Sequence, residues 1–250
     1  MNQLSKYPHL SWYVSNLKSI PGGTYRFGFT KDQETAATRI TMSPFRMGAT
    51  PVTWGMWKEY CKSKSVRMPD KPEWGYPDDH PVVNVSWNDI MKSGGFCKWA
   101  SGVAGFKLLL PTDAQYEYAA RGGKDGEYPW GNAFDKSKLW CSDSLFTDPG
   151  KTAAVDRTNR IYRNGYGLTD MVGNVEQWCA DYYNDDYCPN GKNPFDTRKS
   201  NERCVRGGSW FTSNPDYFRC AGCRRGEPSD YRISRTGVSN VGFRLSAGQK

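Results

Sequence analysis

Glycine and proline interrupt this sequence at short intervals from one end to the other, with 26 glycines and 15 prolines among 250 residues. The pairs Gly22-Gly23, Gly122-Gly123 and Gly207-Gly208 permit positive φ angles and close approach of two backbone segments. Because such residues end regular elements, the chain is expected to form short helices and strands joined by many turns. Aromatic residues make up 14% of the chain, enough for a substantial core. Together these features favour one α+β domain over residues 1–250.

Three short helices are predicted, and each begins after a residue that can cap it: Thr53, Ser86 or Thr112. Asp89 and Gln115 lie three residues after the last two of these and complete capping boxes. Glycines at 94–95 weaken the second helix. These three helices are expected to account for the regular α content.

Short strands are predicted where apolar and polar residues alternate: residues 24–27, 39–42, 204–206 and 241–244. The first two of these runs read as a hairpin. Residues 182–200 are rich in Asp, Asn, Pro and Gly and are expected to form a surface loop.

The chain is basic, with a formal charge of +8 and a pI near 9.0. Its Lys and Arg residues are scattered and form no block or helical stripe, so a solvated surface is expected and a nucleic-acid partner is not. No apolar run approaches the roughly 20 residues that a spanning helix needs. Residues 1–6 lack the apolar core of a signal peptide. That start is compatible with a mature segment behind a removed leader and with a cytoplasmic protein.

Eight cysteines are many for a reduced protein and few for a disulfide scaffold of this length. Cys61 and Cys97 fall in apolar helical patterns, which predicts buried free thiols. Cys220 and Cys223 form a C-x-x-C motif. It lacks the strand-to-helix context of a redox motif and the second ligand pair of a zinc site. Coincidence or a local disulfide is therefore favoured over a functional pair.

A series of short motifs runs through the chain in a fixed order. The motifs lie at 20–28, 50–53, 80–87, 110–123, 128–131, 164–178, 206–210 and 242–244. In this order they resemble the formylglycine-generating, sulfatase-modifying enzyme family over about residues 20 to 246. The resemblance implies that family's α+β variant of the C-type lectin fold, with short strands, two or three helices and many loops.

In active members of that family, two cysteines shortly after the Gly-Gly-Ser-aromatic motif bind copper(I), which soft thiolates select. Here residues 211–218 contain no cysteine, and Thr212 stands where the first is expected. The resemblance therefore implies a chain without this oxidase chemistry and without a cofactor. It also implies a calcium site in the loop from Asp170 to Gln177. That site would be weakened because Gln177 replaces a usual Glu ligand.

The composition shifts between Phe211 and Asn240, where Lys, Gln, Met, Leu and Trp are all absent. Binding loops favour the Tyr, Ser, Asn and Gly residues that remain, and randomised adenines in AAC-like codons encode a similar set. The segment resembles the variable region of diversity-generating-retroelement target proteins, a group with a member from Treponema, and a variable binding region is predicted over about 205–245. The candidate contacts are Phe211, Thr212, Ser213, Asp216, Tyr217, Phe218, Gly222, Cys223, Ser229, Asp230, Tyr231, Ile233 and Ser234.

These observations predict a non-enzymatic binding protein whose ligand is a protein or glycan on another cell. The resemblance implies a bacterial surface lipoprotein, with a lipid anchor upstream of Asn2 as its one membrane attachment. Two rivals remain, a copper-dependent thiol oxidase using Cys220 and Cys223, and a cytoplasmic accessory domain with a degenerate site. Aromatic side chains dominate interface energetics. The expected anchors are Phe211, Tyr217, Phe218 and Tyr231.

Overall fold

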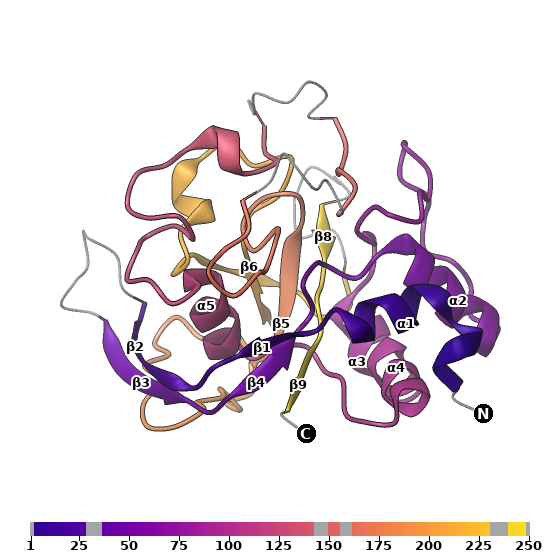
Figure 1. The fold of residues 1–250 in the computed structure, drawn as a ribbon, viewed down its shortest axis with the longest axis horizontal. Coiled ribbons are helices and arrows are strands. Elements are labelled where there is room, and N and C mark those ends of the chain that lie inside the picture. Colours follow the sequence, from indigo (N-terminus) through magenta and orange to yellow (C-terminus); the bar gives the residue numbers. More distant parts are fainter. Residues whose placement is uncertain (1–2, 29–36, 143–149, 156–161, 231–239, 249–250) are drawn as a thin grey trace.

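The computed structural model describes residues 3–28, 37–142, 150–155, 162–230 and 240–248 (Figure 1). Its α-helices are Pro8–Ser15 (α1), Trp54–Lys64 (α2), Trp87–Met91 (α3), Phe96–Ala104 (α4) and Asp113–Arg121 (α5). Its short 3-10 turns are Gln3–Lys6 (η1), Lys136–Lys138 (η3) and Pro215–Phe218 (η4). Its strands are Lys18–Ile20 (β1), Gly23–Phe27 (β2), Thr38–Met42 (β3), Phe45–Met47 (β4), Glu176–Tyr182 (β5), Arg203–Arg206 (β6), Cys223–Gly226 (β7), Val241–Gly242 (β8) and Ser246–Gly248 (β9).

The three predicted helices are confirmed as α2, α3 and α5, and both capping boxes form at Ser86 and Thr112. The second predicted helix ends at Met91 and continues as α4, because Gly94 has a φ of 81°. A Cβ at Gly95 would lie 2.7 Å from the Asp89 carbonyl oxygen, so the break needs glycine here.

Helix α1 was not expected from the sequence. Pro8 occupies the first turn, where its missing N–H is no loss. The free N–H groups of His9 and Leu10 donate to the two carboxylate oxygens of Glu59 in α2, at 2.8 and 3.0 Å. The cap of α1 therefore comes from a residue about fifty positions away, and no local sequence pattern predicts it.

The strands in the described part of the chain form three small sheets. Strands β2 and β3 pair as the predicted antiparallel hairpin. A second sheet has the order β1-β4-β9, and the third has the order β7-β6-β5-β8, in which β5 and β8 are parallel. Strand β5 shows no alternation in the sequence because six of its seven residues are buried. The predicted strand at 241–244 shortens to two residues, and residues 183–200 form the expected loop.

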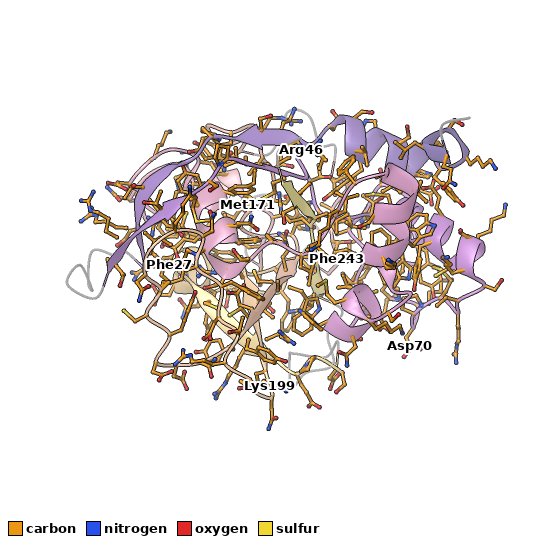
Figure 2. All side chains as sticks on the ribbon, turned by 90° about the horizontal axis from the view of Figure 1, so that it is seen from below. Phe27, Arg46, Asp70, Met171, Lys199 and Phe243 are labelled. Carbon is orange, nitrogen blue, oxygen red and sulfur yellow. The ribbon has the colours of Figure 1, made fainter. Side chains whose placement is uncertain are left out.

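Helices α1 to α4 gather on one side of the central strands β5, β8 and β9, whereas α5 and the β2–β3 hairpin lie on the other side (Figure 1). The helical side holds the largest apolar cluster, in which Trp57 stacks on Phe96 with ring centroids 5.2 Å apart. Phe243 packs edge-on against both rings and lies in the interior (Figure 2). The architecture is the mixed α+β fold with short strands and many loops that the sequence predicts. None of the described helices has the length and apolarity that crossing a membrane requires.

Candidate active site

A two-glycine turn follows β6 and sets the position of the candidate site. Gly207 and Gly208 have φ values of 98° and 63°, which L side chains rarely adopt. A Cβ at Gly207 would lie 2.8 Å from the Tyr116 hydroxyl, and one at Gly208 would lie 2.6 Å from the Phe218 ring. The turn is thus closely packed on both sides, and the residues after it emerge in one fixed direction.

Hydrogen bonds hold the next residues of this turn. The Ser209 N–H donates to Thr212 Oγ1 at 3.1 Å, and the Thr212 N–H donates back to the Ser209 carbonyl at 3.0 Å. The Trp210 N–H donates to the Asn174 carbonyl at 3.0 Å. Asn240, from the other end of the predicted binding region, donates through Nδ2 to Ser209 Oγ at 3.3 Å. Thr212 therefore belongs to a rigid, locally bonded turn.

A surface pocket of about 210 Å³ opens beside this turn. We call it the Thr212 pocket. Two of its aromatic residues, Phe211 and Tyr217, are 46% and 43% exposed. The lining residues are Phe211, Thr212, Ser213, Asn214, Tyr217, Arg224 and Asn240.

A part-buried ion pair joins Arg224 in the pocket wall to the buried Glu176. Arg224 Nη1 is 2.5 Å from Oε1 of Glu176, and the guanidinium lies 4.9 Å from the centroid of the Tyr217 ring. Burial raises the pKa of Glu176, and Arg224 opposes that shift. Among the described residues, neither Glu176 Oε2 nor Asn240 Oδ1 has a hydrogen-bond partner, although both atoms are buried. Unpaired buried acceptors are costly, so these two atoms mark a polar, incompletely bonded interior directly behind the pocket wall.

The structure brings together some of the predicted contact residues and separates others. Four of them line the pocket: Phe211, Thr212, Ser213 and Tyr217. Asp216 and Ser229 are exposed outside it, and Asp230 is partly exposed. Tyr231, Ile233 and Ser234 lie outside the described residues. Sequence reasoning missed Asn214, Arg224 and Asn240. Asn214 follows Thr212 along the chain, whereas Arg224 and Asn240 reach the turn through tertiary structure that no motif reveals.

Phe218 was wrongly predicted as an exposed anchor. Its side chain is fully buried, because the ring packs on Gly208 and stacks on Phe134 at 5.8 Å between centroids. Gly222 lies just before β7, outside the pocket lining. Cys223 is on β7 next to Arg224, and adjacent strand residues point to opposite faces of a sheet. Its thiol therefore faces away from the pocket.

The eight cysteines are free thiols. Cys61 and Cys97 are buried as predicted. The local disulfide between Cys220 and Cys223 is not formed. Burial raises the pKa of Cys220 to about 12, whereas the thiol beside Cys223 is that of Cys204.

The predicted calcium loop already holds a cation. The buried Arg244 guanidinium donates to Gln177 Oε1 at 2.6 Å and to the carbonyl oxygens of Thr169 and Asp170 at 2.7 and 2.9 Å. The Gln177 Nε2 group donates to the same Asp170 carbonyl at 2.7 Å. Oxygen atoms that calcium would need are thus turned toward a guanidinium, and the loop does not fit a calcium ion.

Residues 12–247 match the model of the sulfatase-modifying factor enzyme 1-like domain. The chain belongs to this FGE-sulfatase family. It is 31% identical over 208 residues to the formylglycine-generating enzyme of Bos taurus, covering 76% of this chain and 50% of that protein. It is 26% identical to the formylglycine-generating enzyme of Thermomonospora curvata, with 94% of each covered. The inactive C-alpha-formylglycine-generating enzyme 2 of Bos taurus is also 26% identical, with 93% and 88% covered.

Two solved structures share the fold. Treponema denticola variable protein 1 has a TM-score of 0.73 at 22% identity, covering 93% of this chain and 95% of that one. PvdO from Pseudomonas aeruginosa has a TM-score of 0.78 at 23% identity, covering 93% and 94%. These likenesses show the family's C-type-lectin-like fold. The chain spans about half the length of the mammalian formylglycine-generating enzymes it matches.

The prediction of a non-enzymatic binding protein is wrong. It rested on the missing cysteines after Trp210 and on the composition of residues 211–240. The relatives overturn it, because bacterial and mammalian proteins matching most of this chain are named formylglycine-generating enzymes. These relatives therefore point to an enzymatic family. The likeness to the Treponema protein shows a shared fold and does not indicate a shared function.

The residues that line the Thr212 pocket do not suit the copper(I) ion that the family resemblance implies. Its seven lining residues include no cysteine or methionine, and copper(I) selects such soft ligands. The Thr212 hydroxyl lies 3.3 Å from Ser209 Oγ within the turn. What the pocket offers is a hydrogen-bonding and aromatic surface that can bind and orient a substrate.

Proposed function

We propose that this chain is a sulfatase-modifying-type enzyme that acts on a cysteine side chain of a polypeptide held in the Thr212 pocket. Membership of the FGE-sulfatase family and the formylglycine-generating activity named for its relatives support the reaction class. The single observation that carries the placement is the pocket beside the Gly-Gly-Ser-Trp turn, whose wall holds an unpaired acceptor at Asn240.

The pocket's chemistry suits a polypeptide. Asn214 and Asn240 line the pocket with side-chain amides, the groups that hydrogen-bond the N–H and C=O of peptide bonds. Phe211 and Tyr217 offer aromatic area for flanking side chains. Arg224 is held in place by Glu176 and presents a fixed positive charge at the pocket. These residues bind and orient the substrate, and no oxidation step is assigned to them.

An aldehyde assay tests the function and its location together. The full chain is incubated with a peptide containing one cysteine, in air, with and without added copper, and aldehyde is captured with an alkoxyamine probe. Phe211→Ala and Asn240→Ala are expected to lower kcat/KM about tenfold, mainly through KM, because they remove substrate-binding contacts. Phe195→Ala is the matched control, since this aromatic side chain is 47% exposed outside the pocket.

Absence of aldehyde with the wild-type chain in both conditions would contradict the proposed reaction. Equal loss in the Phe195 control and the pocket variants would contradict the proposed location. The bacterial cell-surface location implied by the resemblance stays a prediction, which surface labelling of cells expressing the full-length gene can check.

A further inference from the structure

Two thiols face each other on the side of the sheet away from the Thr212 pocket. The β6–β7 register places Cys223 directly opposite Arg206. Cys204 lies two residues before Arg206 and therefore on the same face of β6. Arg224, the neighbour of Cys223, points to the pocket side. The two cysteines come from adjacent strands and occupy a diagonal position across them.

The sulfur atoms of this pair are close enough to share one ion. Sγ of Cys204, Sγ of Cys223 and a carboxylate oxygen of Asp113 all lie within 4.8 Å of one another. Cys204 is buried, whereas Cys223 is partly exposed, so the pair can be reached from the surface on the Cys223 side. The side chains of Cys204 and Cys179 belong to the apolar cluster under this face, and Phe27, Tyr183 and Cys223 pack against it.

Asp113 is not free to act as a third ligand. Both of its carboxylate oxygens accept hydrogen bonds from the Arg206 guanidinium, with Nη2 to Oδ2 at 2.8 Å. Arg206 also lies 3.3 Å from Glu117 Oε2. The guanidinium is thus already paired with two carboxylates, and the thiols are the donors that remain for a metal.

A buried hydroxyl lies in the same region. Tyr187 Oη is buried and has no hydrogen-bond partner among the described residues. Its ring packs on Phe27, with ring centroids 6.1 Å apart, and Phe27 packs against the cluster that contains Cys204. An unused O–H donor suits a site that becomes anionic when occupied.

We propose that Cys204 and Cys223 bind one copper(I) ion through their two sulfur atoms. The two thiols lose their protons and the ion forms two Cu–S bonds, leaving an anionic bis-thiolate beside Arg206, with no change in oxidation state. Soft thiolates select copper(I), whereas a structural zinc ion takes four ligands, and Asp113 is engaged elsewhere. The site differs from the family position at Thr212 and does not depend on the proposed activity at the pocket.

Metal binding is measured with the full chain carrying Cys188→Ser, since Cys188 is an exposed thiol outside the pair. The protein is kept reduced by a phosphine under nitrogen and titrated with copper(I) against a chromophoric copper(I) chelator. One ion per chain is expected. Adding Cys223→Ser should weaken binding by at least about 100-fold, as loss of one of two ligands predicts. Circular dichroism of that variant checks that it is folded.

Cys220→Ser is the matched control, because Cys220 is a buried thiol three residues away that does not join the cluster. It should keep one tightly bound ion, and zinc(II) at equal concentration should not displace copper(I). The proposal is overturned if the Cys188→Ser chain binds no copper(I), if Cys223→Ser binds as tightly, or if Cys220→Ser loses the ion. Alkylation showing a Cys204–Cys223 disulfide in the phosphine-reduced protein would also overturn it. None of these outcomes depends on the aldehyde assay.

Discussion

Asp113→Asn tests the buried charge network that joins α5 to β6 and so supports the turn at the Thr212 pocket. Asp113 and Arg206 have side chains 3% and 1% exposed and are joined by two hydrogen bonds. Arg206 also contacts Glu117, which pairs with Arg121 at 2.6 Å. Two carboxylates and two guanidinium groups therefore balance in charge, and the substitution leaves one buried positive charge in excess.

Breaking a buried pair by removing one partner typically costs about 3–5 kcal/mol. Because the new asparagine side chain would keep an acceptor oxygen and Glu117 would remain, a loss near the lower end, about 3 kcal/mol, is expected. Urea unfolding followed by tryptophan fluorescence measures it. Asp135→Asn is the control, since its pair with Lys138 has both side chains 38% exposed and such pairs contribute at most about 1 kcal/mol.

An equal loss of unfolding free energy in the two variants would refute this reasoning. A second check replaces both partners by apolar residues, as Asp113→Leu with Arg206→Met. That double variant should be less destabilised than Arg206→Met alone, because it leaves one fewer unpaired charge in the interior. A strictly additive result would show that the two side chains do not act as a unit.

Two further predictions follow from the turn and from a buried acid. Gly208→Ala should lower the unfolding free energy by about 1–3 kcal/mol, because φ is positive and the new methyl meets the Phe218 ring; Gly102→Ala, with open space around it, should not destabilise in the same urea assay. Burial, and then Asp113, raise the pKa of Asp181 to about 7. A carboxyl group whose pKa is raised by folding favours the folded state when protonated, so that stability is lost as pH rises from about 4 to about 7. Asp181→Asn should flatten this decline in melting temperature between those pH values, and an unchanged decline would contradict the assignment.

Local signals in the sequence predicted three of the α-helices that the structure describes, α2, α3 and α5. The caps at Ser86 and Thr112 work through side chains and N–H groups three residues apart, so sequence alone reveals them. The N-terminal helix was missed because Glu59 satisfies its first N–H groups from another element. Strand β5 was missed because burial on both faces removes the period-two pattern.

Part of the candidate site could also be predicted from local sequence. Phe211 and Tyr217 lie in a polar, turn-rich stretch, and their exposure follows from local composition. Phe218 was misplaced because Gly208, ten residues earlier, makes room for its ring. Arg224 reaches the pocket from β7 through a strand register that no sequence pattern specifies.

The same register brings Cys204 close to Cys223. The C-x-x-C motif indicates a different partner, Cys220, so the sequence did not predict this pair. The function was mispredicted from the sequence for a different reason. The absence of a cysteine at position 212 concerns one residue, whereas the match over residues 12–247 covers nearly the whole chain and identifies its family.

We propose that the chain modifies a substrate cysteine at the Thr212 pocket. The most direct measurement is the mass of two peptides, identical except for a cysteine or a serine, after incubation with the full chain in air and copper. The mass change of thiol-to-aldehyde conversion is expected in the cysteine peptide only, and Asn240→Ala should slow that change markedly. An unchanged cysteine peptide would contradict it.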